Sequence, residues 1–170
     1  MNMSGLKKVF GLAVILLMIG CTSSTDELDV REVVYSLHQV STTPINGQVT
    51  FTEVDPTTVQ IAISLRGTQA GLPHPAHLHF GTVTESGELA FRLNDVDAAS
   101  GQSVTLLENQ LLSDGQTLTY DLLREMNGSI KIHMNVEAGS VFANFAVATG
   151  NIGANSREYD PNSITVCTGH

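Results

Sequence analysis

The fold class is indicated most clearly by the residues Gly47-Gln-Val-Thr-Phe-Thr-Glu-Val-Asp-Pro-Thr-Thr-Val-Gln-Ile-Ala-Ile-Ser-Leu65. Its large apolar residues recur at every second position, at Val49 and Phe51 before Asp55-Pro56 and from Val59 to Leu65 after it. Successive side chains of a β-strand point to opposite faces, so this period of two indicates two half-buried strands joined by a turn.

Turn-type dipeptides recur along the rest of the chain. They stand at Asn46-Gly47, Asp55-Pro56, Ser86-Gly87, Ser100-Gly101, Asp114-Gly115, Asn127-Gly128 and Ala138-Gly139. The period of two returns at Ile130, Ile132 and Met134, and a helical turn or two is expected only at Thr119 to Met126. The pattern therefore predicts an all-β, antiparallel sandwich.

The N-terminus has the features of an export signal. Lys7-Lys8 precedes the short apolar run from Val9 to Ile19, and Leu16-Leu-Met-Ile-Gly-Cys21 resembles the lipobox of bacterial lipoproteins. We expect residues 1–20 to be a signal peptide and Cys21 to carry the lipid that binds the protein to the bilayer. An ordinary cleaved signal peptide is the alternative.

The remaining chain then divides into a polar tether, residues 21–30, and one domain, residues 31–170. The location expected for this lipoprotein is the membrane surface, facing the periplasm or the cell exterior.

The charge of the chain is strongly negative. The formal net charge is −9, and removal of residues 1–20 takes away two lysines and no acid, which leaves −11. Such a surface repels nucleic acid and anionic headgroups, so no nucleic-acid partner is expected and membrane attachment must come from the lipid. The same charge favours cations.

Three histidines stand within six residues, at His74, His77 and His79. On an extended segment His77 and His79 project from the same face, so one strand can offer two imidazoles to one metal ion. His133 stands on the strand predicted around Ile130 and Ile132, and its side chain projects from the face opposite to theirs. We therefore expect the two strands to bring His77, His79 and His133 together at the outer wall of the sandwich.

These motifs resemble copper/zinc superoxide dismutases. The likeness covers most of residues 45 to 155 and rests on His74-Pro-Ala-His-Leu-His79, on Ile132-His133 and on Thr149-Gly-Asn-Ile-Gly153. The resemblance implies a Greek-key β-sandwich, superoxide dismutase-like or immunoglobulin-like. It also implies that His77, His79 and His133 bind copper, with His74 as a supporting histidine.

Departures from that family matter for function. No histidine lies between His79 and His133, where the family has its bridging and zinc histidines, so no zinc site is expected. The arginine that guides superoxide in the family would fall at Asn155, with Arg157 two residues later. Efficient dismutation is therefore not expected.

The early A-H-x-H-x-G pattern and the strand Asn127-Gly-Ser-Ile-Lys-Ile-His133 are still more similar to the chordin-type (CHRD) domain of bacterial secreted proteins and lipoproteins. This resemblance implies a related β-sandwich. It says little about an activity.

The sequence thus favours a lipid-anchored protein that binds one copper ion for storage or transfer, through His77, His79 and His133, with His74 as a fourth ligand or a support. A copper carrier or another protein is a possible partner. Two alternatives stay open: a metal-free CHRD module that binds a protein or glycan, and a weak copper-only superoxide dismutase. Cys167 is either a free thiol near the C-terminus or a soft copper ligand together with His170.

Overall fold

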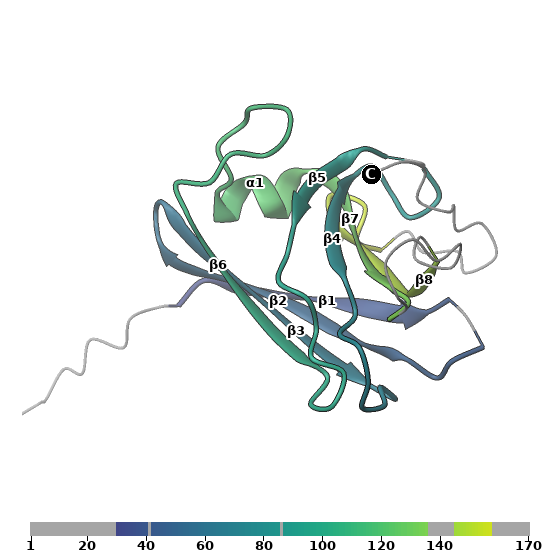
Figure 1. Ribbon diagram of the computed structural model, residues 1–170. Coiled ribbons are helices and arrows are strands. Elements are labelled where there is room, and N and C mark those ends of the chain that lie inside the picture. Colours follow the sequence, from purple (N-terminus) through teal and green to yellow (C-terminus); the bar gives the residue numbers. More distant parts are fainter. Residues whose placement is uncertain (1–29, 41, 86, 136–144, 158–170) are drawn as a thin grey trace, which may run out of the picture.

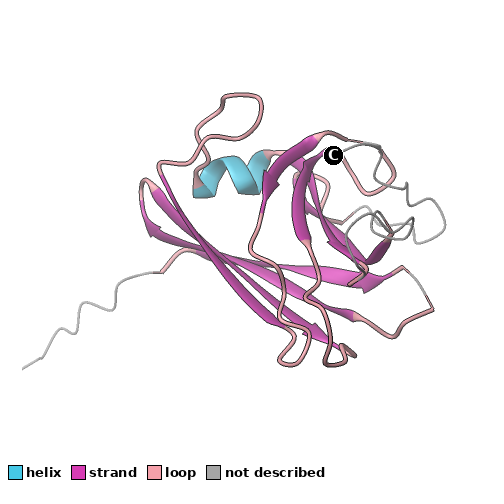
Figure 2. Ribbon diagram, in the orientation of Figure 1, coloured by secondary structure: helices cyan, strands magenta, loops and turns pink. Residues whose placement is uncertain are grey.

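The computed structural model describes residues 30–40, 42–85, 87–135 and 145–157. This part of the chain is almost entirely antiparallel β-structure, as the sequence predicts, with one short helix (Figure 2). None of its helices has the length and apolar character needed to cross a membrane. The predicted signal peptide and Cys21, as well as Cys167 and His170, lie outside the described residues.

The strands within the described residues are four to ten residues long. They are β1 (Glu32–Gln39), β2 (Asn46–Asp55), β3 (Thr58–Arg66), β4 (Ala76–Phe80), β5 (Leu89–Arg92), β6 (Gln102–Glu108), β7 (Asn127–His133) and β8 (Ala146–Gly153), and the helix is α1 (Tyr120–Glu125).

One curled sheet contains all eight strands, in the order β5-β4-β7-β8-β1-β2-β3-β6. The curl occurs at β1, whose first six residues pair with β2 while His38 and Gln39 pair with β8. The sheet thereby folds into two facing halves, β5-β4-β7-β8 and β1-β2-β3-β6, with α1 at one end between them (Figure 1). The arrangement is that of a sandwich.

A single apolar cluster fills the space between the two halves. Phe51 and Ile61 come from β2 and β3, Leu78 comes from β4, and Ile130 and Ile132 come from β7, all with no exposed surface. These are residues that the period of two assigns to the core, so the prediction of inward faces is confirmed for β2, β3 and β7. Burial of this apolar surface is the main force that closes the sheet on itself.

The helix also lies where the sequence predicts it. Thr119 caps its N-terminus, since the Thr119 side chain accepts a hydrogen bond from the backbone N–H of Leu122 at 3.1 Å. Met126 ends the helix, and β7 begins at the next residue.

Two of the predicted turns are wrong. Asn46-Gly47 and Asn127-Gly128 open strands β2 and β7. A Cβ atom on Gly47 would lie 2.0 Å from the carbonyl oxygen of Ser64, and one on Gly128 would lie 3.1 Å from that of His79. Glycine is present there because neighbouring backbones approach closely, which is its other common role in sheets. The turns at Asp55-Pro56, Ser100-Gly101 and Asp114-Gly115 are confirmed.

Candidate metal centre

Strands β4 and β7 are neighbours, which places the predicted histidines side by side. His77 pairs with Lys131 and His79 pairs with Ser129 across the two strands. Since alternate residues share a face, His77, His79 and His133 all project from the face opposite to the apolar core. The strands are held in register by the apolar pairs Leu78 with Ile130 and Ala76 with Ile132 on the inner face.

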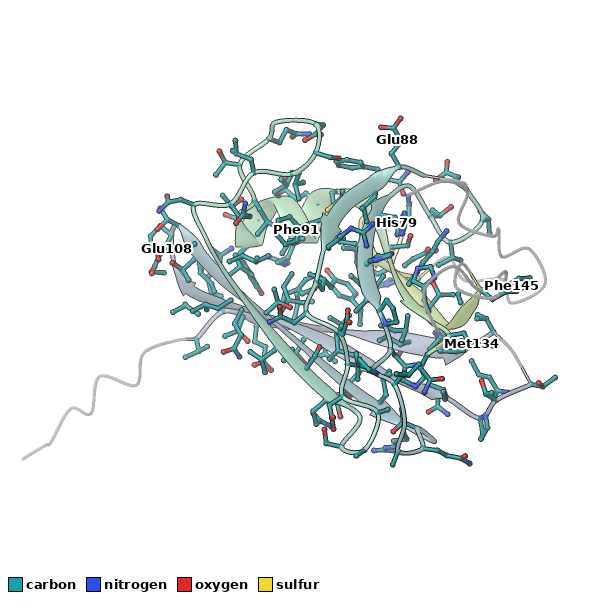
Figure 3. The ribbon with its side chains drawn as sticks, viewed as in Figure 1. His79, Glu88, Phe91, Glu108, Met134 and Phe145 are labelled. Carbon is teal, nitrogen blue, oxygen red and sulfur yellow. The ribbon has the colours of Figure 1, made fainter. Side chains whose placement is uncertain are left out.

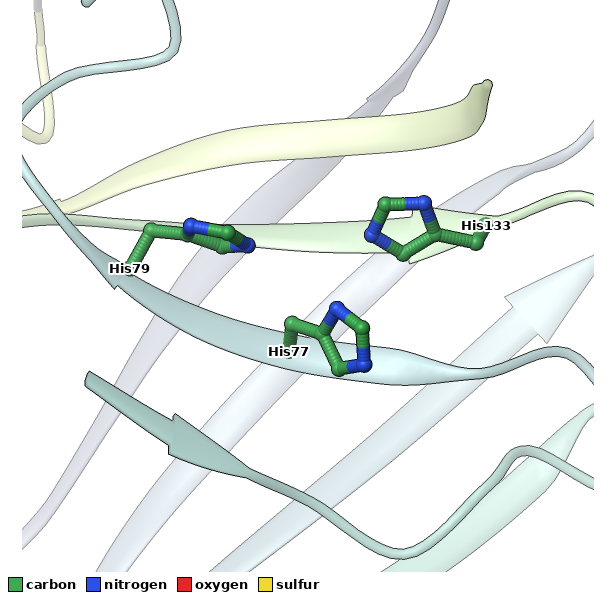
Figure 4. Close-up of side chains that lie close together, drawn as sticks. All are labelled: His77, His79 and His133. Carbon is green, nitrogen blue, oxygen red and sulfur yellow. The ribbon is translucent and has the colours of Figure 1, made fainter. Parts of the chain in front are cut away.

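The three imidazoles form one compact group. One nitrogen from each of His77, His79 and His133 lies within 4.8 Å of the others. The ring centroids of His77 and His79 are 5.9 Å apart, and those of His77 and His133 are 4.6 Å apart. Figure 4 shows His77 between the other two rings, with His79 on β4 and His133 at the end of β7. Nitrogens bound at about 2.0–2.1 Å to one tetrahedral ion would be about 3.4 Å apart, so the 4.8 Å limit is about 1.4 Å wider than the spacing within a metal-bound set.

The histidines lie on the predicted outer face of the sheet, but this face is buried. His77 is 7% exposed, and His79 and His133 are each 1% exposed. The loop after β4 folds back over this face: the backbone N–H of Val83 donates to Oδ1 of Asn151 on β8 at 2.7 Å, and Val83 itself is fully buried. The sequence pattern identified the correct face but gave no sign of this cover.

In two of the rings a hydrogen bond occupies one of the nitrogens. Nδ1 of His79 lies 3.1 Å from the carbonyl oxygen of Gly87, and since a carbonyl only accepts, Nδ1 carries a proton and donates. Nη1 of Arg92 donates to Nε2 of His77 at 3.2 Å. Arg92 stands opposite His77 on β5. A guanidinium therefore borders the histidine group.

His74 supports the group from outside it. Its Nδ1 donates to the carbonyl oxygen of His133 at 2.9 Å, and its backbone forms a bridge to Val96. The backbone N–H of His133 in turn donates to the carbonyl oxygen of Pro75 at 2.8 Å. The described group of possible ligands consists of His77, His79 and His133 without His74. Of the two roles predicted for His74, this geometry favours the supporting one.

The end of the β7–β8 pair lies next to His133. The backbone N–H of Met134 donates to the carbonyl oxygen of Phe145 at 2.8 Å, so the two residues lie across from each other just beyond the strands (Figure 3). This hydrogen bond, together with that of Pro75, anchors the backbone on both sides of His133. The third imidazole is therefore held by sheet structure, like the first two.

Three polar residues on the same face were not among the candidates from the sequence. Lys131 and Ser129 alternate with the inward residues of β7 and are 1% and 0% exposed, and Arg92 comes from the edge strand β5. The period of two already places Lys131 on the face of His133, but neither its burial nor the approach of Arg92 has a signal in the sequence. Asn155, the position of the dismutase arginine, donates from its side-chain amide to Oδ1 of Asn127 at 2.8 Å.

A comparison with models of protein families finds no match, and no curated protein matches the sequence. The likeness to superoxide dismutases and CHRD domains therefore rests on the motifs alone.

Proposed function

We propose that this protein binds one copper ion through His77, His79 and His133, with His74 as a positioning residue, and that it stores or transfers the ion. The observation that carries the proposal is the convergence of three buried imidazoles on one face of two paired strands. Most isolated histidines on strands are exposed or singly satisfied, and three within metal-ligand reach have few structural uses.

The donor set favours copper among the metals that imidazole binds. Affinity of nitrogen sites for the divalent ions rises to Cu²⁺ and falls again at Zn²⁺, and Cu⁺ also accepts a three-coordinate set of nitrogens. No carboxylate or thiolate belongs to the described group. Lys131 and Arg92 border it, and nearby positive charge disfavours a divalent ion more than a monovalent one. Both considerations point to copper.

The surrounding residues would fix the geometry of such an ion. Gly87 orients His79, and His74 holds the backbone of His133, as outer partners of metal ligands commonly do. Three protein nitrogens leave a coordination position for water, an anion or the ligand of a copper carrier. That open position suits transfer and also permits weak redox chemistry of the dismutase type.

Metal analysis of protein purified from its native compartment tests the proposal directly. We expect copper in excess of zinc, at up to one ion per chain, and binding tighter than micromolar when the metal-free protein is titrated with copper. Binding weaker than micromolar, or a His133→Ala variant that binds as well as the wild type, would remove the site. A metal-free binding module of the CHRD type would then be the better interpretation.

We also propose that the protein is an exported lipoprotein anchored through Cys21, because the lipobox-like stretch Leu16 to Cys21 follows a short apolar run. A Cys21→Ser variant is expected to move from the membrane fraction to the soluble fraction. Unchanged fractionation, with an N-terminus other than Cys21, would contradict the anchor and would leave the copper proposal untouched.

A further inference from the structure

We infer that a small inorganic anion binds on the outer face of β7 beside the three histidines, with Lys131 and Ser129 as its donors and Arg92 at the rim. The metal part of this inference rests on the proposed function. The anion site itself does not, since its donors are separate from the three imidazoles.

The cations stand in one row across the sheet. Arg92 on β5 pairs with His77 on β4, His77 pairs with Lys131 on β7, and Lys131 pairs with Thr149 on β8. Directly opposed residues of antiparallel strands have Cβ atoms about 5 Å apart, so Arg92 and Lys131 flank His77 on either side. A protein with a formal net charge of −9 thus gathers two of its few cations at one buried group.

The ammonium group of Lys131 has no partner within the described structure. The side chain is 1% exposed, and its Nζ makes no hydrogen bond. The hydroxyl of Ser129, two residues earlier on the same face and fully buried, is also without a hydrogen bond. Buried polar atoms are normally satisfied, and an isolated buried ammonium is among the most costly exceptions.

Two other buried polar residues on this face, Thr149 and Asn151, have hydrogen bonds within the protein. The hydroxyl of Thr149 donates to the carbonyl oxygen of Ile130 at 2.7 Å, and Oδ1 of Asn151 accepts from the backbone of Val83. Of the four paired residues Lys131, Thr149, Ser129 and Asn151, only Lys131 and Ser129 have a side-chain polar atom without a hydrogen bond. The contrast with Thr149 and Asn151 indicates that the ammonium of Lys131 and the hydroxyl of Ser129 face a ligand site.

The chemistry of that ligand follows from its donors. An ammonium has three N–H donors and no acceptor, a guanidinium has five N–H donors, and a hydroxyl can donate one more hydrogen bond. The ion pairs of the described residues involve Arg31, and neither Lys131 nor Arg92 has a carboxylate partner there. A negatively charged acceptor would satisfy the donors and compensate both charges. Complete burial of Lys131 and Ser129 restricts the ligand to a few atoms.

A metal at the histidines would strengthen this preference. The ion would add positive charge to a buried group that already holds Lys131 and Arg92, so an anion in the open coordination position would be stabilised by all three. Lys131 and Ser129 would then act as positioning residues for the anion, and not as ligands of the metal.

Azide is a suitable probe, because it is a monoanion of three atoms and gives a charge-transfer absorption band on Cu²⁺. Its affinity is measured by calorimetry on the metal-free protein and by absorption on the copper-loaded protein, at constant ionic strength. We expect one azide per chain, and a loss of affinity of about tenfold or more in Lys131→Met, because a charged hydrogen bond is removed. Ser129→Ala should lose severalfold. Arg66→Gln, which removes an exposed cation at the end of β3, is the matched control and should change little.

Copper affinity, measured in parallel, separates this inference from the proposed function. Wild-type protein that binds copper tightly but has the same azide affinity as Lys131→Met would overturn the anion site and leave the metal site standing. If azide binding depends on Lys131 but the protein does not bind copper, the anion site would stand and the metal site would be overturned. Lys131→Met should bind copper at least as tightly as the wild type. Should that variant fail to fold, Lys131→Gln and Ser129→Ala carry the same test, and azide affinities like that of the wild type in both would overturn the inference.

Discussion

The two halves of the curled sheet share one core but differ on their outer faces. In the half β1-β2-β3-β6 the outer face is open to solvent and partly apolar, with Val34 48%, Val104 53% and Leu106 61% exposed. In the half β5-β4-β7-β8 the outer face of β7 is fully buried and polar. One half thus exposes apolar residues while the other buries histidines and a lysine.

This difference between the two outer faces bears on where the proposed site lies. The open half follows the usual balance of a half-buried sheet, in which single exposed apolar residues are unremarkable. The covered half keeps polar groups out of water at a cost that no apolar packing explains. Buried polar groups retained against that cost are the reason for placing the proposed site on this face.

The largest effect is expected in the shared core. Phe51 has no exposed surface and packs edge to face on Tyr35, with ring centroids 5.5 Å apart. Phe51→Ala should lower the free energy of unfolding by about 3–5 kcal/mol, because it removes apolar burial and leaves a cavity. Chemical denaturation measures the change. Leu106→Ala on the open face should stay within about 0.5 kcal/mol, and a comparable loss there would mean that this face is also covered.

The next largest effect concerns the covered face. His77→Ala or His133→Ala should weaken copper binding by about a hundredfold or more, since each removes one of three ligands. His38→Ala is the control, because His38 is exposed on β1 and lies outside the histidine group. Competition titration against a chelator of known affinity gives the constants. Equal affinities in all three variants would contradict the assigned ligands.

Replacement of Lys131 is expected to raise the stability of the protein. Lys131→Met keeps the apolar stem and removes a buried charge that has no partner, so we expect the metal-free, anion-free protein to gain about 1 kcal/mol or more of stability. Thermal unfolding in a buffer without small anions measures it. A destabilised variant would show that the ammonium is satisfied in the folded protein.

The smallest effect concerns the loop that covers the histidines. Glu85 accepts hydrogen bonds from the backbone N–H and the hydroxyl of Thr82 and from the amide of Asn127, and these bonds lower the pKa of Glu85. A carboxyl whose pKa is lower in the folded state stabilises the fold above its unfolded pKa, about 4.3, and loses that contribution as the pH falls through the folded pKa.

Glu85→Gln should therefore reduce the hydrogen-exchange protection of the Val83 amide at neutral pH, and the difference from the wild type should vanish in acid. Glu88→Gln is the matched control, because Glu88 is exposed and points away from the molecule (Figure 3). Equal protection in the wild type and Glu85→Gln at neutral pH would show that this carboxylate does not hold the cover in place.

The amino-acid pattern alone indicates which side chains share a face. The period of two is a local property of the backbone, so Phe51 and Ile61 were assigned inward and His77, His79 and His133 outward before any strand was placed. The cap at Thr119 is equally local. The turn predicted at Asn127-Gly128 was wrong because glycine serves two purposes that look alike in the sequence. It permits tight turns, and it also permits the close approach of neighbouring strands that is found here.

The residues that contact each face could be identified only from the folded protein. The pairing of β4 with β7 joins residues 48 to 56 positions apart, and the approach of Arg92 and the fold-back of the loop at Val83 depend on that pairing. Long-range pairing is set by the packing of the whole core and by loop closure, which leave no periodic trace in any one segment. The histidines could therefore be named from the sequence, whereas their burial and their cationic neighbours could not.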